Sequence, residues 1–342
     1  MGGLVTAAAV IALVVTVAAM PVVLSWLRRL QVLDLPNPRS SHSMPTPRGG
    51  GIAVVFGMAG GLLAAQVDGH AGVSWLLVPV AAYALLGLAD DRKSLPAALR
   101  LAVQALAAVG AVLVLLQRLG APAGIQPWWG QGVCCAAAVV WVVGCTNAFN
   151  FMDGVNGISS LNAILAGVFF AWLGASRGVA GIELTGVIIA VSALGFLPWN
   201  APQARIFLGD VGSYALGSAL ALCGVWAAWA GVDLMLVAAP LGIYVADTGW
   251  ALLKRLFGHR PWHEAHREHV YQRLVDVGIS HLASAAVTMT ASALLVAVVA
   301  VLDESSPIGP AIGAAGIVVG YLSLPRLITP ALARRQSAGA AV

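Results

Sequence analysis

Long apolar runs, separated by short polar connections, recur along the whole chain. Each run covers about 17–23 residues, which is enough for an α-helix to cross a hydrocarbon core of about 30 Å. The pattern predicts eleven membrane-spanning helices, at about 4–26, 49–66, 73–89, 99–117, 132–147, 155–175, 179–197, 211–229, 232–250, 281–302 and 308–327. The division between the eighth and ninth rests only on Ala230-Gly231, so ten or twelve helices remain open.

The composition excludes an ordinary soluble protein. The chain is 60% hydrophobic and 9% charged, whereas soluble domains are about 25% charged. We therefore predict an all-α polytopic integral membrane protein, with residues 1–342 as one domain and 254–280 as a cytoplasmic substrate-binding loop within it.

The first apolar run lacks a basic start and leads into Arg28-Arg29, so it predicts a first helix and not a cleavable signal. All four cysteines lie in apolar runs, which favours buried small side chains over a disulfide or metal set.

The basic residues are distributed unequally between alternate connections. One set of connections and the carboxyl-terminal segment hold 16 of the 18 lysines and arginines, and the other set holds only Arg118 and Arg177. Because basic residues in short loops stay on the cytoplasmic side, the amino terminus is predicted outside and the carboxyl terminus inside.

Acidic residues recur at the predicted cytoplasmic ends of the apolar runs. These acids are Asp90, Asp91, Asp153, Asp210 and Asp247. Any one of them alone is best explained as a helix cap, but five at one face of the membrane indicate that they act together at one site. Carboxylates from separate helix ends suit Mg²⁺, which keeps positions for water and phosphate and neutralises charge during phosphoryl transfer.

Two further groups of polar residues lie on the same predicted face. Asn147, Asn150 and Asp153 are three residues apart and share one broad helix face, where amides are able to bind substrate beside a carboxylate. The loop 254–280 is rich in histidine and arginine, which favours phosphate or pyrophosphate binding over a basic segment that only fixes topology. Gly49-Gly50-Gly51 is compatible both with a phosphate at a helix start and with a tight re-entry into the membrane. We assign no role to His70 or His281.

Taken together, the motifs resemble the polyprenyl-phosphate N-acetylhexosamine-1-phosphate transferase family, glycosyltransferase family 4. They are Asp90-Asp91-Arg92, Asn147-Ala-Phe-Asn150-Phe-Met-Asp153-Gly154, Phe207-Leu-Gly-Asp210-Val-Gly-Ser213 and Asp247-Thr248. The family includes phospho-MurNAc-pentapeptide and GlcNAc-1-phosphate transferases, and the resemblance spans about residues 34–274. It implies ten or eleven transmembrane helices. It also implies attack by undecaprenyl phosphate on the sugar-linked phosphate of a UDP-N-acetylhexosamine, releasing UMP, with Mg²⁺ or its substitute Mn²⁺.

The resemblance also implies roles for individual residues. Metal ligands would be Asp210 and Asp153, and catalytic residues Asp90, Asp91 and His269, with Asp90 activating the lipid phosphate. Substrate-binding residues would be Asn147, Asn150, Asp153, Arg260, His266 and Arg267. The expected location is a bacterial inner (plasma) membrane, with the active site at the cytoplasmic face of the lipid bilayer. No nucleic-acid partner is expected, and a homodimer remains open.

The histidine loop departs from the pattern of the family. His266 replaces an aspartate, and Tyr271 and Gln272 replace the last two histidines. This form resembles the branch that starts O-antigen synthesis with 6-deoxy sugars. It predicts a preference for a 6-deoxy N-acetylhexosamine over GlcNAc or the MurNAc-pentapeptide, because the Tyr271 ring would pack against an apolar C6 methyl group.

Two other classes of protein share parts of the pattern. A secondary transporter also has many helices and intramembrane charges, but it places them near the bilayer midplane, often in repeated halves. A non-catalytic lipid-binding scaffold would not need five carboxylates on one face. Release of UMP from a UDP-sugar, dependent on Mg²⁺ and polyprenyl phosphate, separates the three hypotheses.

Overall fold

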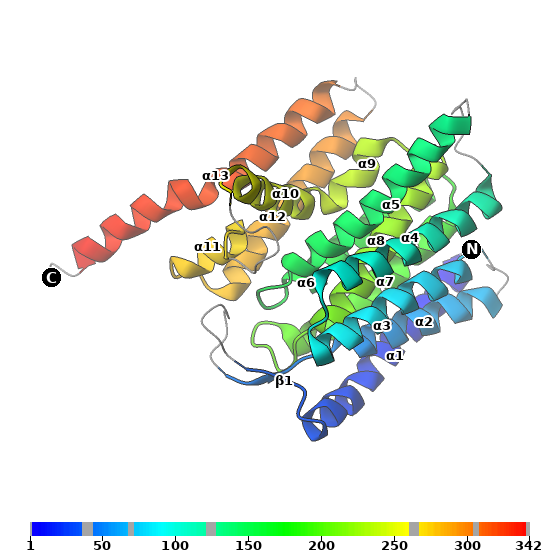
Figure 1. Cartoon of the computed structure of the whole chain (residues 1–342), viewed down its shortest axis with the longest axis horizontal. Coiled ribbons are helices and arrows are strands. Elements are labelled where there is room, and N and C mark those ends of the chain that lie inside the picture. The colour runs from blue at the N-terminus through cyan, green and yellow to red at the C-terminus, as the bar shows by residue number, and fades with distance from the viewer. Residues whose placement is uncertain are drawn as a thin grey trace.

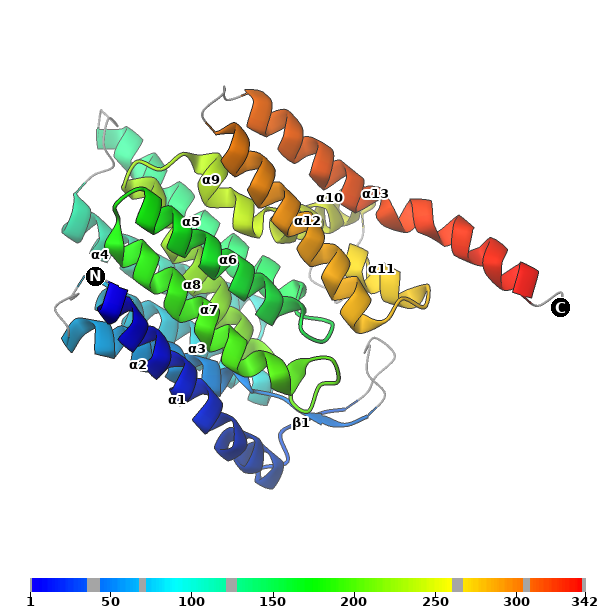
Figure 2. The ribbon, with the colours of Figure 1, turned by 180° about the vertical axis from the view of Figure 1, so that it is seen from behind.

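A computed structural model describes residues 2–35, 44–67, 72–120, 128–259, 267–303 and 308–339. The chain folds into a bundle of long helices (Figures 1 and 2). The helices are α1 (Gly2–Arg29), α2 (Gly51–Val67), α3 (Leu77–Lys93), α4 (Ala97–Leu119), α5 (Trp128–Phe151), α6 (Ile158–Ser176), α7 (Ala180–Asn200), α8 (Gly209–Trp229), α9 (Leu234–Ala238), α10 (Gly242–Phe257), α11 (Val270–Asp276), α12 (His281–Leu302) and α13 (Ile308–Gly339). Short 3₁₀ turns η1 (Ser74–Leu76) and η2 (Ala239–Leu241) precede α3 and α10, and β1 (Leu33–Asp34) pairs antiparallel with β2 (Thr46–Pro47).

The prediction of an all-α polytopic membrane protein is confirmed. Each predicted apolar run coincides with a helix or, for 232–250, with the continuous segment α9–η2–α10. Within the described residues, ten helices are long and apolar enough to cross a membrane, and α2 is an apolar helix of 17 residues. The division after α8 is real, because the chain turns at Ala230-Gly231 and Gly231 adopts φ +87°.

One predicted helix end is wrong. Asp247 was expected to close its helix, but α10 continues ten residues further, to Phe257. No proline or glycine after Gly249 interrupts the helix before Gly258, so backbone hydrogen bonding continues past the first charged residues. Asp247 is therefore buried inside the bundle, with 1% of its surface exposed.

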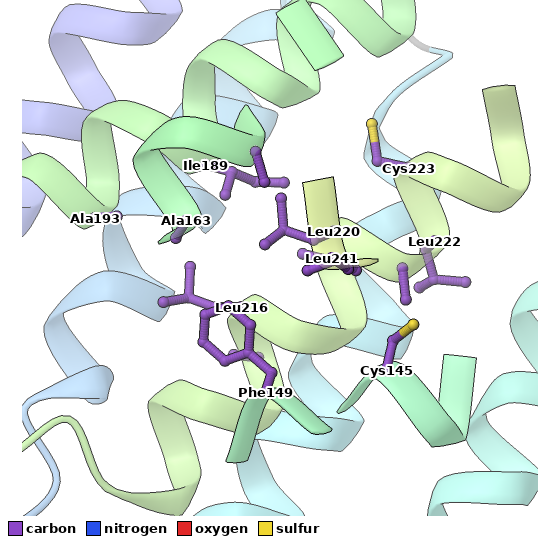
Figure 3. Close-up of a cluster of buried hydrophobic side chains, with 14 of the residues drawn as sticks. Cys145, Phe149, Ala163, Ile189, Ala193, Leu216, Leu220, Leu222, Cys223 and Leu241 are labelled. Carbon is purple, nitrogen blue, oxygen red and sulfur yellow. The ribbon is translucent and has the colours of Figure 1, made fainter. Parts of the chain in front are cut away.

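Helix α8 forms the centre of the bundle. Nearly all of its residues are buried, and it packs against α3 and α5, as expected for a helix that is apolar on every side. Figure 3 shows part of this core, where Leu216, Leu220 and Leu222 of α8 lie among Phe149 of α5 and Leu241 of η2.

Glycines allow other helices to approach the first turn of α8 closely. A methyl group on Gly51, at the start of α2, would overlap the backbone of Gly212. One on Gly87 of α3 would overlap the backbone of Asp210. Helix backbones can approach this closely only where side chains are absent.

Connections from distant parts of the sequence gather at one end of the bundle, called here the site end. It carries the β1–β2 pair, the α3–α4, α5–α6 and α7–α8 connections, and α11 (Figure 1). Most of the basic connections lie there, so the site end is the one predicted to face the cytoplasm.

Cysteine labelling tests this orientation. In a variant without the four native cysteines, a cysteine at exposed Ser94 or Ser280 should react only from the cytoplasmic side. Ser176, at the opposite end of α6, is the matched control and should react only from outside. Labelling of Ser94 from outside would reverse the predicted topology.

Candidate active site

A polar cavity of about 260 Å³ opens among the connections at the site end. Its walls come from six separate segments: β1, the residue after β2, the end of α5 with the α5–α6 connection, the α7–α8 connection with the first turn of α8, α11 and the start of α12. The lining residues are Asp34, Arg48, Asn150, Asp153, Gly154, Val155, Asn156, Asn200, Phe207, Leu208, Gly209, Asp210, Gln272 and His281. Most of them are polar, in a chain that is otherwise mostly apolar.

Arg48 is fixed on the cavity wall by its backbone. Its N–H donates to the carbonyl of Val32, and Arg48 forms a bridge with Phe207. The next two N–H groups, of Gly49 and Gly50, both donate to the carbonyl of Phe207 at 3.1 and 2.8 Å. These bonds tie the α1–α2 connection to the α7–α8 connection.

The guanidinium of Arg48 joins two carboxylates. Its Nε lies 2.8 Å from Asp91 Oδ1 and its Nη2 lies 2.6 Å from Asp210 Oδ1. Burial alone would lower the pKa of Arg48, but the carboxylates of Asp210 and Asp91 outweigh it and raise that pKa above its ordinary range. In the sequence, Arg48 counts only among the basic residues that predict the topology, although an arginine directly before three glycines is a usable signal for an anion-binding connection.

Asp91 holds the first turn of α8. Its carboxylate accepts hydrogen bonds from the N–H groups of Asp210, at 2.9 Å, and Val211, at 3.0 Å. The first N–H groups of a helix have no partner within the helix and favour a negative charge beside them. Asp91 thus satisfies the start of α8 and sets the position of Asp210.

Asp90 has a different set of partners. It accepts hydrogen bonds from Arg100 at 2.8 Å, the Tyr214 hydroxyl at 3.1 Å and the N–H of Leu95 at 2.7 Å. Neighbouring residues on a helix point about 100° apart, so the two acids face different elements. Asp90 is buried and is not among the residues that line the cavity; its predicted role toward the lipid phosphate stays a prediction.

Asn150, Asp153 and Asp210 meet at the cavity. Asn150 Nδ2 donates to Asp210 Oδ1 at 2.8 Å and to Ser213 Oγ at 2.9 Å, and Asp153 lines the wall just beyond the end of α5. Asn147 lies one turn earlier and donates instead to Gln104 Oε1 at 2.6 Å. The structure therefore separates Asn147 from the other two members of its motif.

The oxygen donors at the cavity fit a magnesium ion. Within the described residues, no three His, Cys, Asp or Glu side chains converge as a complete metal site. Mg²⁺ usually takes only one or two carboxylates and completes its shell with water and substrate phosphate. Asp153 and Asp210, with the amide oxygen of Asn150, supply such a partial set.

The pKa of Asp153 reflects the negative charges that lie close together at the cavity. Burial raises its pKa to about 7, and the positive charge of Arg48 opposes this rise while Asp210 and Asp91 add to it. A bound cation would favour the ionised carboxylate and displace its proton.

His269 is the N-terminal cap of α11 and is not among the residues that line the cavity, so its predicted catalytic role stays a prediction. Its ring is buried, stacks on Tyr271 and Phe151, and has Nδ1 3.4 Å from Asp247 Oδ1. Asp247 also accepts from the N–H of Val270 at 2.9 Å, so it anchors α11 to the bundle.

The remaining predicted loop residues are only partly placed. Arg267 forms an ion pair with Asp276 at 2.6 Å and does not line the cavity. Arg260 and His266 lie outside the described residues. The predicted loop 254–280 includes the end of α10 and all of α11.

Tyr271 does not take the place that the sequence suggested. It is 1% exposed, its hydroxyl donates to the carbonyl of Phe151 at 2.9 Å, and its ring fills the space beside Gly154. The expected contact between this ring and a sugar methyl group is therefore wrong. Gln272 lines the cavity instead, as does His281, for which no role was predicted.

Comparison with known proteins places this site in a family. The family described as Glycosyl transferase family 4 matches residues 73–228. A decaprenyl-phosphate N-acetylglucosaminephosphotransferase of Mycobacterium leprae is 31% identical over 290 residues, covering 74% of this chain and 72% of that protein. A phospho-N-acetylmuramoyl-pentapeptide-transferase of Moorella thermoacetica is 30% identical over 277 residues, covering 73% of this chain and 84% of that protein.

A third relative extends over more of the chain. The probable undecaprenyl-phosphate N-acetylglucosaminyl 1-phosphate transferase of Bacillus subtilis is 27% identical over 277 residues, covering 80% of this chain and 77% of that protein. The chain thus belongs to glycosyl transferase family 4, and the resemblance seen in the motifs is confirmed.

Substitution of Asp91 tests its part in holding α8. Asp91→Asn removes the ion pair with Arg48 and leaves one oxygen for two N–H donors, so the free energy of unfolding should fall by about 1–3 kcal/mol. Thermal unfolding in detergent measures this fall. Lys93→Met, at an exposed position two residues further along the chain, should leave the unfolding temperature unchanged. If Asp91→Asn unfolds at the wild-type temperature but has lost activity, Asp91 acts in the reaction and does not stabilise the start of α8.

Proposed function

We propose that this protein transfers an N-acetylated hexosamine 1-phosphate from a UDP-sugar to undecaprenyl phosphate, releasing UMP. The observation that carries the proposal is the cavity at the site end, where Asp153, Asp210, Asn150 and Arg48 converge. The names of the Bacillus subtilis and Mycobacterium leprae relatives support a polyprenyl phosphate acceptor and a hexosamine phosphate.

The proposed reaction exchanges one phosphoanhydride for another. An oxygen of the acceptor phosphate attacks the sugar-linked phosphorus and forms a new P–O bond. The P–O bond to the uridine phosphate breaks, and its electron pair leaves with UMP. Several negative phosphate oxygens approach one another in this step, so stabilisation of charge is the main catalytic need.

The residues of the cavity are suited to that need. Asp210, Asp153 and Asn150 would hold Mg²⁺, which when bound neutralises charge on phosphoryl oxygens. Arg48 offers a planar fork of donors that matches phosphate oxygens. Asp91 keeps Asp210 in place, and Gln272 and His281 offer further polar groups on the opposite wall.

The architecture keeps both substrates within reach of the cavity. A polyprenyl tail is apolar and remains in the hydrocarbon, while its phosphate stays at the ends of the helices. The cavity lies at those ends, among connections and not at mid-helix. A transporter would instead place its charged groups near the midplane.

The finer parts of the proposal rest on the sequence. The distribution of basic residues supports a bacterial inner membrane protein with its cavity at the cytoplasmic face. The form of the loop at Tyr271 and Gln272 supports a role in starting O-antigen synthesis. Use of Mn²⁺ in place of Mg²⁺ and assembly as a homodimer belong to the same set of proposals.

Release of UMP tests the reaction. Purified protein with a UDP-N-acetylhexosamine should release UMP only when undecaprenyl phosphate and Mg²⁺ are both present. Asp210→Asn keeps the size of the side chain but removes its charge, so turnover should fall about a hundredfold or more. Asp233→Asn is the matched control, because Asp233 is an exposed cap of α9 at the far end of the bundle. UMP release without the acceptor lipid would reject the proposed reaction.

A panel of donors tests the choice of sugar. The predicted preference for a 6-deoxy N-acetylhexosamine now depends on Gln272, the replaced histidine position that lines the cavity. Gln272→His should shift the ratio of kcat/KM toward UDP-GlcNAc by about tenfold, the size expected for one changed polar contact. Gln203→His, at an exposed position that does not line the cavity, should leave the ratio unchanged. If the kcat/KM of the wild-type protein for UDP-GlcNAc equals or exceeds its kcat/KM for the 6-deoxy donors, the predicted preference is wrong.

A further inference from the structure

The cavity already contains a cation that belongs to the chain. The Arg48 guanidinium lies within 2.8 Å of both Asp91 and Asp210. Asp210 is one of the two carboxylates suited to a divalent ion, so a bound metal and Arg48 would compete for the same side chain. Two cations on one carboxylate repel each other unless an anion separates them.

The two carboxylates do not depend on Arg48 equally. Asp91 has two backbone N–H groups of α8 as further donors, at 2.9 and 3.0 Å. The Asp210 carboxylate accepts a second side-chain hydrogen bond from the neutral amide of Asn150, at 2.8 Å and on the same oxygen, Oδ1. Departure of Arg48 would therefore leave Asp91 in place, while Asp210 Oδ1 would keep only the uncharged amide of Asn150 as a side-chain partner.

The side chain of Arg48 can turn while its backbone stays fixed. Hydrogen bonds to Val32 and Phe207 hold the surrounding backbone. The side chain is 36% exposed and forms part of the cavity wall. A rotation about its own bonds would bring the guanidinium to an anion in the cavity without any movement of the α1–α2 connection.

We propose that Arg48 is an internal counter-cation, which neutralises Asp210 in the free protein and turns from it to the donor's diphosphate when substrate and metal bind. The inference rests on the proposed function, since it needs a diphosphate donor. It gives Arg48 two successive partners. In the free protein the guanidinium offsets part of the negative charge of Asp91 and Asp210, and in the complex it binds the diphosphate through paired hydrogen bonds. Asp210 becomes available to the metal as the anion arrives.

A purely structural role for Arg48 predicts the opposite effect on metal binding. If the ion pairs only hold the first turn of α8, loss of Arg48 would loosen Asp210 and weaken the binding of every ligand. If Arg48 is a competing cation, its loss should strengthen metal binding and weaken donor binding. The sign of the change in metal affinity separates these roles.

Measurement of Mn²⁺ affinity by electron paramagnetic resonance, without nucleotide, provides the test. Arg48→Met should bind Mn²⁺ about tenfold more tightly than wild type, the size of one charge-assisted hydrogen bond. In the presence of Mn²⁺, the same variant should bind the UDP-sugar about tenfold more weakly. Arg48→Lys keeps the charge but cannot bind both carboxylates at once as the guanidinium does. Its Mn²⁺ affinity should therefore lie between those of wild type and Arg48→Met. Arg92→Met, which removes an exposed arginine next to Asp91, should match wild type in both measurements.

The possible results distinguish a failure of this inference from a failure of the proposed function. Equal or weaker Mn²⁺ binding by both Arg48 variants, in a protein that still releases UMP, would overturn the inference alone. If Arg48→Met does not fold, tighter binding by Arg48→Lys supports the inference, and equal or weaker binding overturns it. Wild-type protein that binds neither Mn²⁺ nor the UDP-sugar would overturn the inference and the proposed function together.

Discussion

The start of α8 is the constraint on which the rest of this structure depends. The first N–H groups of a helix have no partner within the helix, and at a start as buried as that of α8 another part of the chain must supply one. Asp91 meets this requirement from α3, and the same carboxylate receives Arg48 from the α1–α2 connection. One contact therefore stabilises the central helix and at the same time fixes the position of Asp210.

The cavity is built outward from that contact through buried polar bonds. Asn150 joins α5 to Asp210, and Tyr271 holds the carbonyl of Phe151, at the end of α5 just before Asp153. Asp247 in turn anchors α11, which carries Tyr271. These residues come from segments far apart in the sequence, so the geometry of the cavity depends on the whole bundle and not on any one loop.

The sequence predicts the helices well because hydropathy is a local property. Each apolar run became a helix, and even the weak division at Ala230-Gly231 was located correctly. The helix end at Asp247 was misplaced because a buried carboxylate with backbone and side-chain partners is compatible with an uninterrupted helix. Composition alone does not show which charges are paired inside a bundle.

The site could be predicted only as a set of residue types. The direction in which each side chain faces depends on partners that are remote in the chain: Arg48 and Asp210 are 162 positions apart, and Asp91 and Asp210 are 119 apart. For this reason the motifs grouped Asn147 with Asn150, although only Asn150 lines the cavity, and they did not indicate that Asp91 holds the first turn of α8. His281 carries no motif that marks it, and only the folded chain brings it and Arg48 to the same cavity.

The glycine contacts around α8 have a consequence for genetic variation in this protein. Gly51 and Gly87 perform no chemistry, yet any side chain at either position would collide with the backbone at the start of α8. In a survey of random substitutions they would tolerate as little change as the cavity residues themselves. Abundance in the membrane would distinguish the two groups, because a collision at Gly51 removes the folded protein, whereas loss of a carboxylate on the cavity wall leaves an intact but inactive one.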